Sequence, residues 1–173
     1  NRAADIFSEL IEEQKKSGRK FNNIEFALGW VNFQKGDYQK AFNIFDELAK
    51  TSVDTFSIKS MYWTAECKRY MNENDAALKI YEDFLEKYPD DELAGEVRFK
   101  IGLIYYNDDK IPYAERYLIT SIDSDNKESR ARAFTLLGEI SLSKEDYLSA
   151  VSYFASAGKS NDISDDLQYR ILL

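Results

Sequence analysis

Apolar residues recur along the chain three or four positions apart, with charged and polar residues between them. In one segment Ala41 is followed four positions later by Phe45 and three positions after that by Leu48. These positions share one face of a helix, because an α-helix has 3.6 residues per turn. Short polar stretches such as KGD, NEND, YPDD and NDDKIP separate the segments and are typical of turns. The pattern predicts a series of amphipathic helices joined by tight turns.

The segment that starts at Ala41 is one copy of a repeat. A small residue followed four positions later by a bulky one occurs at Ala3, Ala41, Ala77, Ala114 and Ala150, at intervals of 38, 36, 37 and 36 residues. A second series of small residues lies twelve positions before four of these alanines, at Gly29, Ala65, Gly102 and Gly138. Small residues at this separation predict antiparallel helix pairs, because they let two helix backbones approach closely. We expect Gly102 and Ala114 to face each other in this way.

The repeated positions resemble the tetratricopeptide repeat, TPR. The stretch from Phe26 to Phe45 matches the pattern of that family at Leu28, Gly29, Gly36, Asp37, Tyr38, Ala41 and Phe45. The stretch from Phe134 to Ala157 matches it at Leu137, Gly138, Asp146, Tyr147, Ala150, Phe154 and Ala157. The sequence departs from the pattern at the family's tryptophan position, which holds Glu25, Met61, Arg98 and Phe134.

The resemblance implies an all-α fold, a right-handed superhelical α-solenoid of antiparallel helix pairs that spans residues 1–173 as one domain. Four full TPR units are expected, with a partial unit at each end. Their boundaries are an orphan helix 2–16, repeats at about 22–54, 55–91, 92–127 and 128–162, and a partial repeat 163–173. Because the sequence begins at Asn1 and ends on three apolar residues, we expect it to be a fragment of a longer array.

Charge and hydropathy exclude some classes of partner. The net charge is −8, which disfavours binding to the phosphate backbone of nucleic acids. No apolar run approaches the roughly 18 residues of a membrane-spanning helix, so no direct membrane insertion is expected in this fragment. Charged residues make up 31% of the chain and apolar residues 44%, which is typical of a soluble globular protein.

Groups that could carry catalysis are scarce. The chain has no histidine, the most frequent general base and metal ligand. Its single cysteine, Cys67, occupies a position that holds apolar residues in the other repeats, so it is expected to be a buried apolar residue. The DSDNKE stretch from Asp123 resembles a calcium loop but lacks the required glycine and glutamate, which favours a solvated turn. We therefore predict neither an enzyme nor a metal or cofactor site.

The first helices of the repeats are the candidate binding surface, because in the TPR family these helices line a concave groove. Aromatic residues dominate the corresponding positions in the first three repeats. The predicted partner-binding residues are Phe26, Trp30, Phe33, Tyr62, Glu66, Arg69, Phe99, Leu103, Tyr106 and Glu139. The alternative is that these aromatics belong to the core. Against it, other faces already provide core residues, Ile24, Leu28 and Val31 in one helix and Val97, Ile101 and Ile104 in another.

The prediction is a protein–protein interaction scaffold that binds a partner segment in an aromatic-lined concave groove. The partner segment should be apolar or aromatic, with a basic residue to meet Glu66 and Glu139. The alternative is a structural array that self-associates through its terminal helices or contacts other domains of its own longer chain. The stretch from Tyr81 to Tyr106 is similar to bacterial cell-envelope TPR proteins, which favours the bacterial periplasm or cell envelope over the cytoplasm.

Overall fold

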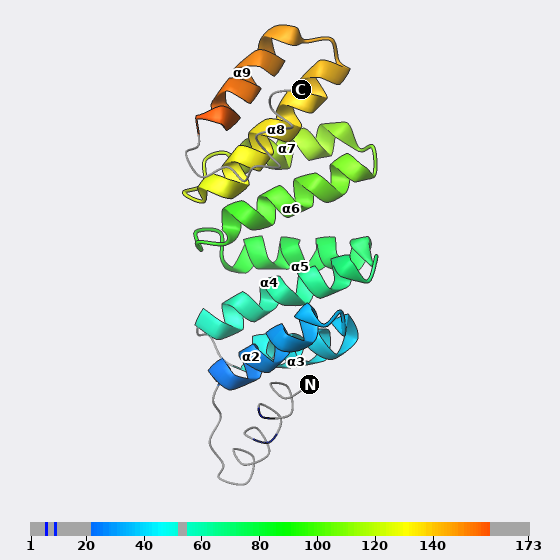
Figure 1. The fold of residues 1–173 in the computed structure, drawn as a ribbon, viewed down its shortest axis with the longest axis vertical. Helices are drawn as coiled ribbons and strands as arrows, with labels where there is room; N and C mark the ends of the chain where they lie inside the picture. The colour runs from blue at the N-terminus through cyan, green and yellow to red at the C-terminus, as the bar shows by residue number, and fades with distance from the viewer. Residues whose placement is uncertain (1–5, 7–8, 10–21, 52–54, 160–173) are drawn as a thin grey trace. The chain divides into compact units, whose positions relative to one another are not determined.

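A computed structural model describes residues 22–51 and 55–159, together with Ile6 and Glu9. Within these residues the chain consists of α-helices and short turns, without a strand. The helices are α2 (Asn22–Gln34), α3 (Tyr38–Thr51), α4 (Thr55–Tyr70), α5 (Asn74–Lys87), α6 (Ala94–Asn107), α7 (Ile111–Ser121), α8 (Lys127–Ser143) and α9 (Tyr147–Gly158) (Figure 1). The expected orphan helix 2–16 and the partial repeat 163–173 lie outside the described residues, apart from the two single positions.

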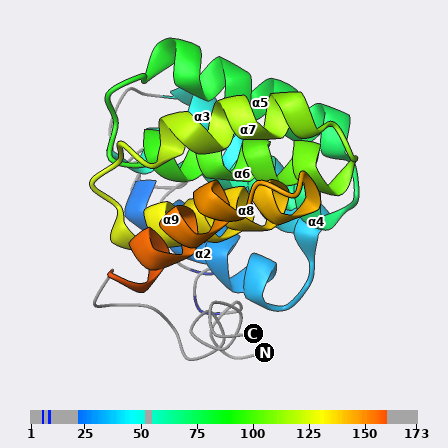
Figure 2. The same cartoon turned by 90° about the horizontal axis from the view of Figure 1, so that it is seen from above.

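Consecutive helices form antiparallel pairs. Contacts are extensive between α2 and α3, between α6 and α7, and between α8 and α9. Figure 2 shows α8 and α9 running side by side. Helix α3 also contacts α4, and α7 contacts α8. The fold is therefore an all-α helical-repeat solenoid, as the sequence predicts.

The chain divides into two compact units, residues 1–83 and 84–173, and the boundary falls within α5. Unit 1 contains α2, α3, α4 and most of α5, and unit 2 contains α6 to α9. The single-domain organisation and the repeat boundaries stay predictions, as does the hand of the superhelix.

The predicted core face is confirmed in unit 2. Val97, Ile101 and Ile104 are buried along α6. The corresponding face of α2 is only half-buried, at Ile24, Leu28 and Val31.

The small residues of the repeat mark the closest contacts within the helix pairs. A Cβ atom at Gly29 would lie 2.6 Å from Cε1 of Phe45, and one at Gly138 would lie 2.6 Å from Cε1 of Phe154. At Gly102 the nearest atom is Cγ of Leu118, at 2.8 Å. Leu118, one turn after Ala114, therefore fills the space between the helices beside Gly102. The facing of Gly102 and Ala114 stays a prediction.

The turn between the two helices of each repeat has the same conformation in all four repeats. One residue per turn has a positive φ, at Gly36 (81°), Asn72 (61°), Asp109 (57°) and Glu145 (59°). The following amide closes the end of the helix, as where Asp146 donates its N–H to the carbonyl oxygen of Ser141 at 2.9 Å. Only glycine adopts this left-handed conformation without steric cost, so the three other turns are strained.

Replacing Gly102 by leucine should lower the free energy of unfolding by about 1–3 kcal/mol, because the added side chain collides with Leu118. Urea denaturation followed by circular dichroism measures the change. An unchanged midpoint would show that the contact between α6 and α7 is wrongly assigned.

Replacing Glu145 by glycine should raise the free energy of unfolding by about 0.5–1 kcal/mol, because the left-handed backbone no longer strains a side chain. Gly36→Ala should lower it by about 1 kcal/mol at the equivalent turn. Glu145→Ala is the matched control, since alanine keeps the strain. A gain with alanine as large as with glycine would contradict the explanation.

Candidate functional site

The predicted aromatic ladder of Phe26, Tyr62 and Phe99 is not an exposed surface. Tyr62 is 7% exposed and Phe99 is 4% exposed, and Phe26 is half-buried. Phe99 belongs to a core cluster with Leu118 and Leu136. The expectation of an exposed ladder is therefore wrong, because this position of the first helix points toward neighbouring helices rather than toward solvent.

The remaining predicted site residues differ in exposure. Phe33 and Glu66 are buried, so the expectation that they lie on an open groove is also wrong. Trp30 is the exposed member of the set, at 37%. The half-buried members are Arg69, Leu103, Tyr106 and Glu139.

A connected group of aromatic rings, two of them exposed, does occur in unit 1, and it includes residues that the sequence prediction missed. We call Trp30, Phe33, Trp63 and Tyr70 the aromatic surface. Trp30 and Trp63 meet edge to face with ring centroids 4.5 Å apart, and Phe33 lies 5.0 Å from both Trp63 and Tyr70. The rings come from α2 and α4, which contact each other. Trp63 and Tyr70 were missed because they lie outside the positions that line the groove by family resemblance.

The outer rings of the aromatic surface reach solvent. Tyr70 is 46% exposed and Trp30 is 37% exposed, and the buried Phe33 ring contacts both. The Arg69 guanidinium lies over the Tyr70 ring, 4.5 Å from its centroid, in a cation–π contact. The surface thus combines two exposed aromatic rings with one adjacent cation. Both tryptophans of the chain belong to it.

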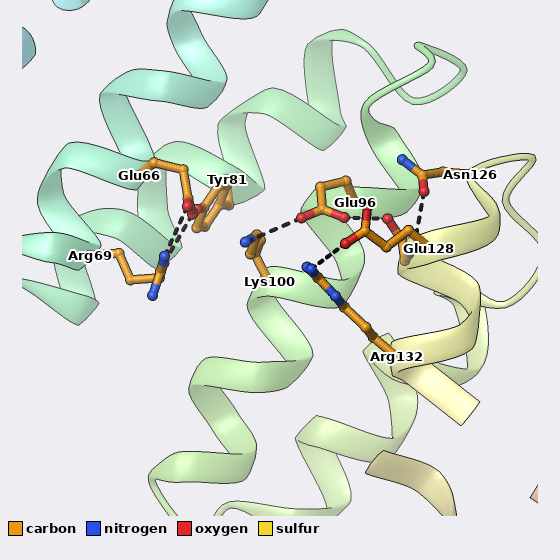
Figure 3. A network of polar contacts seen from close by, with 9 residues as sticks. Glu66, Arg69, Tyr81, Glu96, Lys100, Asn126, Glu128 and Arg132 are labelled. Carbon is orange, nitrogen blue, oxygen red and sulfur yellow. Dashed lines mark hydrogen bonds and ion pairs between the residues drawn. The ribbon is translucent and has the colours of Figure 1, made fainter. Parts of the chain in front are cut away.

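Beside this surface, Glu66 is held in a hydrogen-bonded network (Figure 3). Arg69 donates from Nε to Oε1 of Glu66 at 3.0 Å and from Nη2 to Oε2 at 2.9 Å. Tyr81 donates its hydroxyl to the same carboxylate. A buried carboxylate needs hydrogen-bond donors of this kind. Glu66 therefore stabilises the contact between α4 and α5 and is not available to bind a basic residue of a partner.

The protonation states in this region follow from burial and from Glu66. Burial raises the pKa of Tyr81 well above its usual value, and the charge of Glu66 raises it further, so the hydroxyl stays protonated. Burial alone would lower the pKa of Arg69, but the hydrogen bonds and charge of Glu66 outweigh it and raise the pKa. Burial, followed by the charge of Glu66, raises the pKa of the Cys67 thiol to about 12. Cys67 is therefore an unreactive core residue, as predicted.

In unit 2 the structure brings two predicted site residues together. Tyr106 of α6 donates its hydroxyl to Oε2 of Glu139 of α8 at 3.2 Å. Leu103, also on α6, packs against the core cluster of this unit. Leu142, one turn after Glu139, is exposed. At these positions unit 2 thus carries a tyrosine–glutamate hydrogen bond and an exposed leucine.

The acidic turns of unit 2 have structural roles. Asn126, within the stretch that resembles a calcium loop, caps α8 by accepting the Ser129 amide at 3.0 Å (Figure 3). Ser129 donates its hydroxyl to Glu96, which also pairs with Lys100 at 3.2 Å. This network links α6 to α8 and supports the reading of the stretch as a turn.

Comparison with known families decides the classification. The family model of the SusR N-terminal TPR domain matches residues 30–163. The chain belongs to this family. The match covers most of the chain.

Solved structures show the same fold for this TPR domain. MamA 41-end from Desulfovibrio magneticus RS-1 has a TM-score of 0.65 at 18% identity, over 94% of this chain and 98% of that chain. The MamA RS-1 ArsTM double mutant has a TM-score of 0.64 at 18% identity, over 98% and 96%. BtubC (BKLC) from P. vanneervenii has a TM-score of 0.73 at 18% identity, over 98% of this chain and 79% of that chain.

No protein of curated function matches the sequence of this TPR domain. TPR domains are typically non-enzymatic, and their general role is protein–protein interaction. In the part of the chain that the structure describes, none of the helices has the length and apolar character needed to cross a membrane.

Replacing Arg69 by alanine should lower the free energy of unfolding by about 3 kcal/mol, because it removes the guanidinium that neutralises the buried Glu66. Tyr81→Phe should cost less, about 1.5 kcal/mol, since it removes one hydrogen bond to the same carboxylate. Chemical denaturation measures both. Equal losses for the two variants would contradict the leading role assigned to the ion pair.

Proposed function

We propose that this TPR domain is a protein-interaction module that holds an apolar or aromatic segment of a partner protein on the aromatic surface of unit 1. The observation that carries the proposal is the joint exposure of Trp30 and Tyr70 on a connected group of rings. Protein interfaces are enriched in Trp, Tyr and Arg at the residues that contribute most to affinity.

The arrangement of the surface fits this role. Phe33 contacts both Trp30 and Tyr70, so the two exposed rings are held in place before a partner binds. Preorganised rings lose little conformational entropy on binding and bury a large area. Arg69 lies beside Tyr70 and is largely satisfied by Glu66, so it adds polar orientation at the edge of the surface.

The chemistry expected of the partner segment follows from the contacts of Glu66 and Glu139 within the chain. Glu66 no longer supports the expectation of a basic residue in the partner, since Arg69 neutralises it within the chain. Glu139 belongs to the separate surface of unit 2, where Tyr106 donates to it. An apolar or aromatic segment therefore fits the unit 1 surface better than a charged one. Location in the bacterial cell envelope stays a prediction from the sequence resemblance.

The alternative function is a structural array that self-associates or contacts other domains of its own longer chain. This function would also depend on exposed apolar area. The bound surface would then belong to a second copy or to the same chain rather than to a partner protein. Selection from a library of random peptides distinguishes the two. A partner-binding surface should select short segments with shared apolar or aromatic positions, whereas a surface that recognises a folded domain should select none.

Replacing Trp30 and Tyr70 together by alanine should weaken binding of the selected peptides at least about tenfold, or 1.4 kcal/mol. Trp63 remains in this variant, so its fluorescence still reports binding in a titration. Circular dichroism should show that the helices are retained, because both removed rings are exposed.

Tyr113→Ala is the matched control, since it removes an exposed tyrosine of α7 outside the aromatic surface. It should bind the selected peptides as the unchanged chain does. Unchanged affinity in the Trp30 and Tyr70 double variant, or equal loss in the Tyr113 control, would rule out the aromatic surface as the binding site.

A further inference from the structure

The outer face of α9 carries no charged side chain. Its exposed residues are Tyr147, Leu148, Val151, Ser152, Ala155 and Gly158. Leu148 is 88% exposed, more than any other large apolar side chain in the described part of the chain. In a chain with 31% charged residues, an uncharged exposed helix face is unusual and is typical of a surface that another molecule covers.

The other repeats provide an internal comparison for this face. Three positions matter, those two before, two after and five after the alanine of the repeat. They hold Gln39, Asn43 and Asp46 in α3, Asp75, Lys79 and Glu82 in α5, Pro112, Arg116 and Ile119 in α7, and Leu148, Ser152 and Ala155 in α9. Among these helices α9 is thus the one in which all three positions are apolar or small.

A further repeat after α9 would not explain the difference. Helix α7 is followed by α8 and contacts it, yet Pro112, Arg116 and Ile119 remain exposed. The position that α8 does approach is a different one, Glu115, which pairs with Lys144 at 2.6 Å. By comparison with α7, Tyr147 and Val151 of α9 lie at positions that a following helix would cover. Their exposure is therefore not evidence for a binding surface. The apolar character of Leu148 and its two small neighbours indicates another contact.

We propose that this face of α9 binds the same face of a second copy of the chain, with the two α9 helices antiparallel about a two-fold axis. The axis passes beside Val151 and Ser152, midway between Leu148 and Ala155. A two-fold interface requires a patch that is complementary to itself. The stripe from Leu148 to Ala155 meets this requirement in shape and in charge.

The shape requirement is met because the stripe is bulky at one end and small at the other. Leu148 and Ala155 are about 10 Å apart along the helix, at 1.5 Å per residue. In the antiparallel arrangement the Leu148 side chain of each copy lies opposite Ser152 and Ala155 of the other. Small residues at a helix contact let the axes approach, so each leucine fills the space beside them. A parallel arrangement would instead place leucine against leucine.

The charge requirement is met at the ends of α9. The exposed Lys159 caps the C-terminal end, and Glu145 and Asp146 stand at the N-terminal end. Antiparallel pairing brings these opposite charges together twice and aligns the helix dipoles favourably. Lys144 at the same end is already neutralised by Glu115. The uncharged centre avoids the repulsion that two copies of net charge −8 would otherwise meet at close contact.

The expected dimer is weak. α9 has 12 residues, so it is about 18 Å long. One face of such a helix buries less than the roughly 800 Å² per partner of a standard stable interface. We therefore expect a reversible equilibrium in the micromolar range or above, rather than a permanent dimer.

Sedimentation equilibrium of the 173-residue chain should show a mean mass that rises from 20.1 kDa toward twice this value as concentration increases. Leu148→Glu should raise the dissociation constant at least tenfold, since it places a charged side chain against the small uncharged residues of the other copy. Ile119→Glu is the matched control, because Ile119 is exposed on α7 outside the stripe. It should leave the dissociation constant unchanged. A chain that stays monomeric at every concentration overturns the proposal, as does equal weakening by both variants.

Cysteine cross-linking tests the antiparallel arrangement directly. The single native cysteine, Cys67, is buried and should not react. Under mild oxidation Ser152→Cys should form a disulfide-linked dimer, because the two copies of this position lie near the axis. Leu148→Cys and Ala155→Cys should cross-link poorly alone and efficiently when the two variants are mixed. Efficient cross-linking of Leu148→Cys to itself would indicate parallel pairing and overturn the proposed geometry.

Discussion

The structure depends on one steric constraint, the close approach of two helices at a position without a bulky side chain. At Gly29, Gly102 and Gly138 an added Cβ would come within 2.8 Å of the aromatic or leucine side chain that closes the pair. The contact fixes both the distance between the helices and their register, because only one bulky residue can occupy the space. The pairs α2–α3, α6–α7 and α8–α9, which carry much of the described structure, share this contact.

This constraint explains why the fold could be predicted from the sequence. A small residue and a bulky residue sixteen positions apart recur in phase, and a recurring contact leaves a recurring pattern in the chain. The side chain nearest to Gly102 is Leu118, the bulky residue four positions after Ala114 in the repeat pattern. Side-chain direction along a helix places this leucine in the gap between the two helices.

The candidate site was less predictable because burial depends on the neighbouring helices. Tyr62 and Phe99 share a repeat position with Phe26, yet the exposed rings are Trp30 and Tyr70. Tyr70 lies at the end of α4 and gains its place in the surface from Phe33 of α2 and from Arg69. The sequence predicted Glu66 as a binding residue, but its carboxylate accepts hydrogen bonds from Arg69 and Tyr81. The Phe33–Tyr70 contact joins α2 to α4 and the Tyr81–Glu66 contact joins α5 to α4, so the pattern along one helix does not indicate them.

The burial of Cys67 has a consequence for how the chain responds to redox conditions. With its pKa raised to about 12, the thiol is almost entirely uncharged at neutral pH, and the thiolate is the form that exchanges with disulfides and reacts with oxidants. With a single cysteine the chain has no internal disulfide that a reducing compartment would break, and the uncharged thiol is a poor target for oxidants. The stability of the described repeats therefore does not depend on a disulfide within the chain.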